Sequence, residues 1–266
     1  MKSIIKLGCL TFLMIFGTTS CSAKYNTLDD ILEKKELVVA TNAEFAPFEY
    51  KEGEEFFGID IDIIKAYCKH IGVECKIVDQ EFDAALLSCS TAKADVAIAG
   101  VTRNAVREKT LSFSNPYYTA NQVVIVKKDS IYSNLKTNEE LLQALSNNKA
   151  KIGVQINTTG QYYVEGDEEW KFDGIKDAEC LIYDNGPIAG KALSQGKIDA
   201  IIIDSAPADI IASSYEELMV LPCILTEEEY AIAVTKNNTT LVESLNEFIE
   251  IIKANGEFEK IVSKYF

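Results

Sequence analysis

KADVAIAG (residues 93–100) recurs in similar form about a hundred residues later as KIDAIIID (residues 197–204). Both segments start with Lys-x-Asp and continue as an apolar strand, which predicts two similar lobes, each built on its own sheet. The strands end at Gly100 and Asp204. Because open α/β sheets bind ligands beyond the carboxyl ends of their strands, we expect a ligand site in a cleft between the lobes. A chance match between two short strand-like segments is the alternative.

Apolar strands alternate with amphipathic helices through most of the chain, which predicts an α/β fold with mainly parallel sheets. Apolar residues recur at helical spacing at Ile61, Ile64, Cys68 and Ile71. Thr137 and Glu140 form a capping box that opens a further helix. The other expected helices cover residues 84–91, 188–194 and 240–254, and the expected strands cover residues 37–40, 76–78, 95–99, 122–126, 151–154, 180–183 and 198–203.

The composition is that of a globular protein and disfavours several kinds of partner. Of the 266 residues, 47% are hydrophobic and 25% are charged, and the formal net charge is −15. Such a negative surface repels nucleic acid and anionic lipid headgroups. His70 is the only histidine, and no two cysteines have the close spacing of a zinc knuckle. We therefore expect no metal site and no cofactor.

The N-terminus has the pattern of an export signal. Lys2 and Lys6 precede a short apolar stretch (residues 7–16), and small residues lead to Cys21. This ending resembles a bacterial lipobox, in which the cysteine is lipidated and becomes the mature N-terminus. Simple secretion with an incidental cysteine is the alternative. We expect a signal peptide over residues 1–21, a tether and short helix over residues 22–36, and a chain held outside the cytoplasm, at the cell surface or in the periplasm, by a membrane lipid anchor on Cys21.

Charged residues at the strand ends fit the chemistry of an α-amino acid, which carries a carboxylate and an ammonium on one carbon. Arg107 closely follows the strand that ends at Gly100, and its guanidinium could hold a carboxylate through two parallel hydrogen bonds. A solvated arginine in a charged loop is the alternative. Asp204 ends an apolar strand, where an unpaired carboxylate is costly, so we expect it to accept the ammonium.

A polar segment, QINTTG (residues 155–160), follows the expected strand at residues 151–154 and is expected to open a helix. Unpaired backbone N–H groups and the positive end of the helix would face the cleft there and attract a carboxylate. A plain threonine N-cap without a ligand is the alternative.

With these segments the chain resembles the family 3 bacterial extracellular solute-binding proteins, the amino-acid receptors of ABC importers, from residue 37 to residue 266. The matching segments are VVATNAEFAPFEY (38–50), FGIDIDII (57–64), GVTRNAVR (100–107), FSNPYY (113–118), GVQINTTG (153–160), DAIIID (199–204), YAIAV (230–234) and KANGEFEKIVSKYF (253–266).

The resemblance implies a two-lobed periplasmic-binding-protein-like fold of type II, in which two α/β lobes are joined by two crossover strands near residues 118–121 and 227–230. It divides the chain into lobe 1 (37–119 and 230–266) and lobe 2 (120–229). It also implies that the chain is a monomer and not an enzyme. Lobe closure would capture a free, polar L-amino acid, and the closed form would deliver it to the membrane permease.

Carried over residue by residue, the resemblance assigns the ligand carboxylate to Arg107 and the ammonium to Asp204. It places further carboxylate contacts at Gly100, Thr102, Thr158 and Thr159. Phe45 and Phe82 match aromatic residues that sandwich the ligand side chain, although an aromatic at such a position is more often part of a core. Asn42 matches a polar residue that reads the tip of the side chain.

Two positions depart from the family pattern. Members that bind cationic amino acids usually have an acid in place of Asn42, although nearby Glu44 keeps a cationic ligand open. Asn157 replaces a common glycine. The ligand therefore stays undecided between a polar neutral amino acid, such as glutamine or cystine, and a cationic one.

Three further alternatives stay open. Similar sequences serve as periplasmic cyclohexadienyl or arogenate dehydratases, which need a general acid beside the leaving hydroxyl. A ligand-sensing module is another use of the same lobes. Cys68 and Cys75 lie where some members have a disulfide, which an oxidising exterior permits, but free thiols are an equal alternative.

Overall fold

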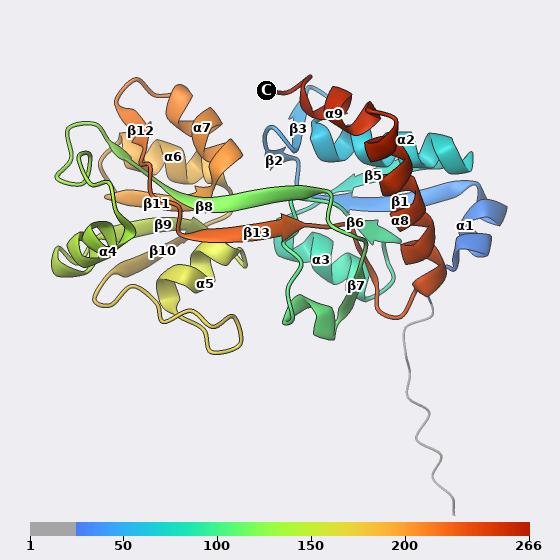
Figure 1. Cartoon of the computed structure of the whole chain (residues 1–266), viewed down its shortest axis with the longest axis horizontal. Helices are drawn as coiled ribbons and strands as arrows, with labels where there is room; N and C mark the ends of the chain where they lie inside the picture. Colours follow the sequence, from blue (N-terminus) through green and yellow to red (C-terminus); the bar gives the residue numbers. More distant parts are fainter. Residues whose placement is uncertain (1–24) are drawn as a thin grey trace, which may run out of the picture.

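The computed structural model describes residues 25–266, and the predicted signal peptide and Cys21 lie outside them (Figure 1). The described chain forms two α/β lobes that lie side by side (Figure 1). None of the helices in these residues is both long and apolar enough to cross a bilayer. The first of them, α1 (Leu28–Lys34), begins at a capping box between Thr27 and Asp30.

The first lobe is built on a five-stranded sheet in the order β5-β1-β6-β14-β7. The first three of these strands run parallel, and β14 is antiparallel to both of its neighbours. The strands are β1 (Glu36–Thr41), β5 (Glu74–Asp79), β6 (Val96–Ala97), β7 (Leu111–Phe113) and β14 (Ala233–Thr235), and the helices are α2 (Ile59–Ile71), α3 (Phe82–Ser90), α8 (Thr239–Ala254) and α9 (Glu257–Val262). A small antiparallel sheet joins β2 (Glu44–Phe45), β3 (Glu49–Glu52) and β4 (Glu55–Phe57).

The second lobe is built on a six-stranded sheet, in which β10, β9 and β11 run parallel and β8 runs antiparallel to β11. Both β12 and β13 pair with the other edge of β8. The strands are β8 (Tyr118–Lys127), β9 (Lys151–Gln155), β10 (Glu179–Tyr183), β11 (Ala200–Asp204), β12 (Leu218–Val220) and β13 (Thr226–Tyr230), and the helices are α4 (Asn138–Asn147), α5 (Thr159–Glu165), α6 (Gly186–Ser194) and α7 (Ser205–Ser213).

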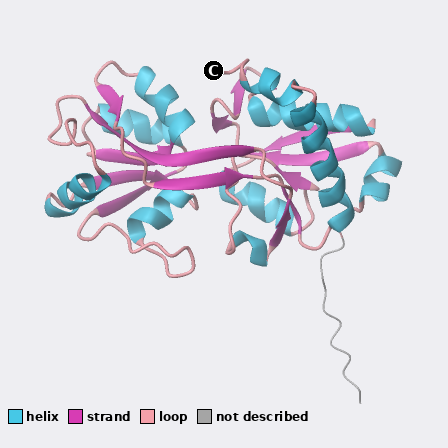
Figure 2. Cartoon of the chain, viewed as in Figure 1, coloured by secondary structure: helices cyan, strands magenta, loops and turns pink. Residues whose placement is uncertain are grey.

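Two paired strands connect the lobes. Figure 1 shows β8 and β13 running together from one lobe to the other, and their antiparallel register pairs Tyr118 with Tyr230. The cartoon coloured by secondary structure shows the helices of each lobe packed around its strands (Figure 2). The predicted α/β architecture of two lobes with crossover strands is confirmed.

The two echoed segments occupy equivalent positions in their sheets, because each forms a third strand with a parallel neighbour on one side and an antiparallel neighbour on the other. In the first lobe β6 lies between β1 and β14, and in the second β11 lies between β9 and β8. The strand β6 has two residues rather than the five expected, because the chain leaves the sheet before Gly100, whose φ is 54°. The helix α7 and the small sheet β2-β3-β4 were not predicted, and the strands of that sheet have only two to four residues, too few to show a periodicity.

All five cysteines of the described chain are free thiols, so the disulfide between Cys68 and Cys75 is not formed in this structure. The two thiols are hydrogen-bonded partners, which raises the pKa of Cys68 and lowers that of Cys75.

Candidate functional site

One cavity between the lobes brings together all nine predicted ligand-binding residues. The first lobe contributes the ends of β1, β2, α3 and the segment after β6, and the second lobe contributes the ends of β9 and β11. The cavity is lined by Asn42, Phe45, Glu49, Phe82, Ala99, Gly100, Thr102, Arg107, Gln155, Thr158, Thr159 and Asp204.

Gly100 allows the close packing at the floor of the cavity. With φ at 54° it has a left-handed conformation, and a Cβ atom there would lie 2.9 Å from the Phe45 ring and 3.3 Å from Tyr230. Its backbone N–H donates to the buried carboxylate of Asp60 at 2.8 Å. A glycine at this position therefore lets the segment after β6 approach the Phe45 ring.

Arg107 is a buried cation, with 8% of its surface exposed. It opens a short 3₁₀ helix, η1 (Arg107–Lys109), and its backbone N–H donates to Asn104 Oδ1 at 2.9 Å. In the guanidinium, Nη1 donates to the Thr102 carbonyl at 2.8 Å, and Nη2 donates to the Asn157 carbonyl in the second lobe at 3.1 Å. Burial lowers the pKa of Arg107 to about 10. The side chain stays charged and keeps further N–H donors for an anion.

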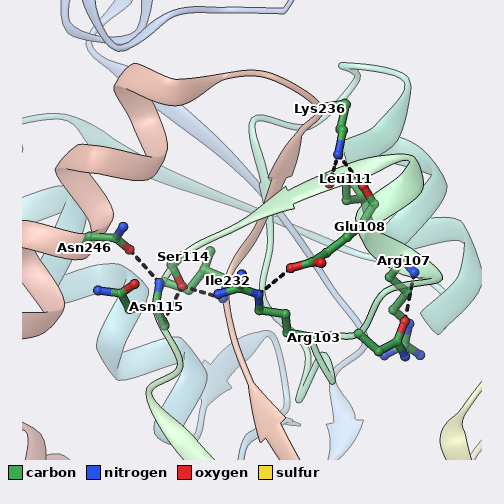
Figure 3. Close-up of polar contacts among 10 residues, drawn as sticks. Arg103, Arg107, Glu108, Leu111, Ser114, Asn115, Ile232, Lys236 and Asn246 are labelled. Atoms are coloured by element: carbon green, nitrogen blue, oxygen red, sulfur yellow. Dashed lines mark hydrogen bonds and ion pairs between the residues drawn. The ribbon is translucent and has the colours of Figure 1, made fainter.

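The loop that carries Arg107 is held by neighbouring contacts of the first lobe. Arg103 Nε donates to Glu108 Oε1 at 2.6 Å, and Lys236 Nζ donates to the Glu108 carbonyl (Figure 3). At the far end of β7, Ser114 Oγ accepts from the Ile232 backbone N–H at 2.9 Å (Figure 3). These contacts tie η1 to the C-terminal part of the chain.

The two predicted threonine contacts from the second lobe differ in their hydrogen bonds. The Thr158 hydroxyl donates to the Gln155 carbonyl at 2.7 Å and does not cap α5 with its side chain. The Thr159 hydroxyl donates to Glu228 Oε2 at 2.8 Å, and the Thr102 hydroxyl of the first lobe donates to the same oxygen. A buried carboxylate on the crossover strand β13 thus connects one predicted ligand-binding residue from each lobe.

Asp204 lies at the end of β11 with 7% of its surface exposed. Its Oδ1 accepts from the Tyr230 hydroxyl at 2.6 Å. Burial and then the nearby Glu228 carboxylate raise the pKa of Asp204 to about 8. A carboxyl group in this state can exchange its proton for a ligand ammonium.

Glu49 is the acidic cavity residue that the sequence prediction missed. It is fully buried, and neither of its carboxyl oxygens has a hydrogen-bond partner when the group is ionised. Burial and the adjacent Asp60 raise the pKa of Glu49 well above its usual value, and burial raises that of Asp60 to about 6. A proton on Glu49 supplies a donor toward Asp60. Glu49 starts the unpredicted strand β3, and four residues give too short a pattern to show which face is buried.

The lobes also touch through side chains at the polar end of the cavity. Gln155 Nε2 of the second lobe donates to Asn42 Oδ1 at 3.0 Å, and Asn42 Nδ2 donates to the Gln80 carbonyl at 3.1 Å. Glu44 does not line this cavity. Its carboxylate accepts from Asn185 in the second lobe and borders a separate open groove. The two lobes are therefore in contact inside the cavity, through Asn42 and Gln155, and beside it, through Glu44 and Asn185.

The sequence pattern of the bacterial extracellular solute-binding proteins, family 3, matches residues 37–266. The chain belongs to this family. It is 28% identical to the arginine-binding extracellular protein ArtP of Bacillus subtilis (strain 168) across 99% of this chain and 96% of that protein.

Solved structures of amino-acid-binding proteins have the same fold. The substrate-binding protein AbpA of an amino-acid ABC transporter from Streptococcus pneumoniae, bound to L-arginine, superposes with a TM-score of 0.80 at 28% identity, covering 90% of this chain and 97% of that one. The ancestral amino-acid-binding protein AncCDT-1, a precursor of cyclohexadienyl dehydratase, superposes with a TM-score of 0.77 at 28% identity, covering 90% and 98% of the two chains.

Proposed function

We propose that this family member captures a free, polar L-amino acid between its lobes and delivers it to the permease of an ABC importer. The observation that carries the proposal is the cavity lined by a buried cation, Arg107, from one lobe and a buried carboxyl group, Asp204, from the other. The similarity to arginine-binding proteins supports it.

The proposed contacts follow from the charges in the cavity. Arg107 binds the ligand carboxylate with N–H groups that are not used by the Thr102 and Asn157 carbonyls. The ligand ammonium binds Asp204, which then ionises. Ligand contacts to Gly100, Thr102, Thr158 and Thr159 complete the carboxylate site, and Phe45 and Phe82 flank the side chain. Closure is stabilised only by contacts that span both lobes.

The tip of the ligand side chain is proposed to meet Asn42 and Gln155. These amides can each donate and accept, which suits a polar neutral side chain. A cationic side chain would find amide oxygens there but no carboxylate, because the two acids that line the cavity are Glu49 and Asp204. A cationic amino acid is the second candidate, because the chain is similar to proteins that bind arginine.

Thermal unfolding of the chain from Ser22 onward, with each of the twenty amino acids, cystine, ornithine and arogenate, tests the function. A ligand at about a thousand times its dissociation constant contributes roughly 4 kcal/mol and raises the unfolding midpoint by several degrees. Replacing Arg107 or Asp204 by alanine is expected to remove that shift. An absence of any shift, in protein freed of carried-over ligand, would contradict the proposal.

A dehydratase is the alternative that one observation favours. Glu49 is a carboxyl group in the cavity whose pKa burial raises well above its usual value, as a general acid requires. The similarity to a precursor of such an enzyme is consistent with this reaction. Release of an aromatic product from prephenate or arogenate would support the enzyme, and loss of that release in Glu49→Gln would assign the acid.

Further proposals concern the parts of the chain around the cavity. We propose the lobe boundaries given above, a monomer, and a lipid on Cys21 that anchors the chain outside the cytoplasm. The extracellular location of the family's members supports this location. Mass spectrometry of the protein from membranes of an expressing bacterium tests the anchor, since a lipidated Cys21 adds acyl mass that Cys21→Ala removes.

A further inference from the structure

A loop of the second lobe, residues 166–174, lies over the predicted carboxylate-binding arginine. Its Trp170 ring lies 5.2 Å from Cζ of Arg107. The Phe82 ring of the first lobe lies 5.2 Å from the same atom. The buried guanidinium therefore contacts one aromatic ring from each lobe.

The 166–174 loop is ordered by its own hydrogen bonds. Asp167 Oδ1 accepts from the backbone N–H groups of Glu169 at 2.8 Å and Trp170 at 2.9 Å. The backbones of Asp167 and Phe172 also bond to each other at 2.9 and 3.0 Å. These bonds fix the position of the Trp170 backbone within the loop.

The Trp170 side chain is connected to Arg107 by a second route. The Trp170 ring stacks on Tyr162 at 4.6 Å, and the Tyr162 hydroxyl donates to Asn157 Oδ1 at 3.2 Å. The Asn157 carbonyl in turn accepts from Arg107 Nη2. Asn157 has a left-handed φ of 56°, which asparagine tolerates better than most residues. Asn157, which replaces a common glycine of the family, thus contacts the Arg107 guanidinium directly.

We propose that Trp170 is a positioning residue that holds the Arg107 guanidinium in place for the ligand carboxylate. The ring face attracts a cation more strongly away from water, and Arg107 is almost fully buried. Contacts from Trp170 and Asn157 fix the plane of the guanidinium before the ligand arrives, which lowers the ordering cost of binding. This inference rests on the proposed role of Arg107, and it assigns part of the binding site to a loop outside the cavity lining.

A neighbouring ion pair provides a matched control. Lys109 Nζ lies 2.7 Å from Glu169 Oε1, joining the same loop to the same 3₁₀ helix, but the two side chains are 57% and 60% exposed. Exposed pairs of this kind contribute little and are screened by salt.

The first test needs no ligand. Trp170 is the only tryptophan in the chain, so its fluorescence reports directly on the contact. In the ligand-free chain from Ser22 onward, Arg107→Met is expected to change the emission intensity and to increase quenching by acrylamide, whereas Lys109→Met is not. Equal emission and quenching in Arg107→Met and the unmodified chain would overturn the proposal, whether or not an amino acid binds.

The second test measures binding by calorimetry with L-arginine, L-glutamine, L-histidine and L-cystine as probes. Trp170→Ala is expected to weaken binding about ten-fold, in line with a desolvated cation–π contact. Trp170→Phe, which keeps an aromatic face, should restore affinity to within about three-fold, and Glu169→Gln should bind within about two-fold of the unmodified chain. Unchanged affinity in Trp170→Ala would exclude a positioning role. If the unmodified chain binds no amino acid, the proposed function fails, while the fluorescence test still decides the contact.

Discussion

Gln155 of the second lobe donates a hydrogen bond of 3.0 Å to Asn42 of the first lobe inside the cavity. This bond joins the two side chains that are proposed to meet the tip of the ligand. It also holds the two lobes in contact at this end of the cavity. A ligand with a hydrogen-bonding tip would replace this bond with bonds of its own.

Asn42→Asp is expected to shift selectivity toward cationic amino acids. An acid at the tip of the cavity pairs with a guanidinium or ammonium group, while Gln155 can still donate to the new carboxylate. We expect the ratio of arginine to glutamine affinity to rise by about ten-fold or more, as for a charge-assisted hydrogen bond of ~1.5–3 kcal/mol. Competition calorimetry with the two amino acids measures the ratio, and Asn42→Ser serves as the control without charge. An unchanged ratio would remove Asn42 from the side-chain site.

Ligand affinity is expected to rise as the pH increases from about 5 to 8. Burial and the nearby Glu228 carboxylate raise the pKa of Asp204 to about 8. A bound ammonium favours the ionised carboxylate, so binding releases a proton throughout that range. Calorimetry in buffers of different ionisation enthalpy counts the released protons. A dissociation constant that stays level from pH 5 to 8, with no proton release, would contradict the pairing of Asp204 with the ammonium.

The stability of the ligand-free protein is expected to change with pH in the opposite direction. The folded pKa of Asp204 lies above the value of about 4 in an unfolded chain. The stabilisation of the folded state by Asp204 is therefore complete below about pH 4, and it is lost as the pH rises through the folded pKa. Asp60, with a pKa raised to about 6, acts in the same direction. The unfolding midpoint should fall by several degrees between pH 5 and 8, and Asp204→Asn should flatten this slope; an equally steep slope in Asp204→Asn would assign it to other groups.

Gly100→Ala is expected to lower both stability and affinity. The added Cβ would lie 2.9 Å from the Phe45 ring, and the left-handed φ is strained for alanine. We expect a loss of about 1–3 kcal/mol in the free energy of unfolding. Binding should weaken because the displaced Phe45 lines the cavity. Chemical denaturation and calorimetry measure the two effects. Gly72→Ala, which also has a positive φ but no neighbour within 4 Å of its Cβ, separates backbone strain from the displacement of the ring.

Glu228→Ala is expected to favour the open form of the ligand-free protein. Both Thr102 and Thr159 lose the carboxylate oxygen that connects them across the cleft, whereas Glu228→Gln keeps an acceptor. Small-angle scattering should show a larger radius of gyration in Glu228→Ala than in Glu228→Gln. Identical radii for both variants and the unmodified chain would mean that this connection does not hold the lobes together.

The sequence predicted the lobes and most of the cavity because both depend on strand ends. Gly100, Arg107 and Asp204 each lie at or shortly after the end of an apolar strand, so periodicity and charge were enough to locate them. Phe45 and Asn42 needed the family resemblance, because nothing local distinguishes a cavity residue from a core residue. Glu49 was missed for a different reason: its burial depends on β3 folding against α2 and on Asp60, which is a tertiary contact.

Contacts between the lobes were the part that sequence patterns could not supply. Trp170 lies far from Arg107 along the chain, and no pattern connects a tryptophan in a charged loop with a 3₁₀ helix of the other lobe. Glu228 was visible only as one of three consecutive glutamates in β13, of which it alone is buried. Such residues become recognisable only when the two halves of the chain are placed together.

The position of β14 has a consequence for the order in which the chain can assemble during synthesis. This strand lies between β6 and β7, although it is made long after both of them. A nascent chain that ends before Ala233 already has every strand of the second sheet, whereas the first sheet still lacks the strand that joins β6 to β7. The lobe that begins the chain is therefore the last one whose sheet can be completed.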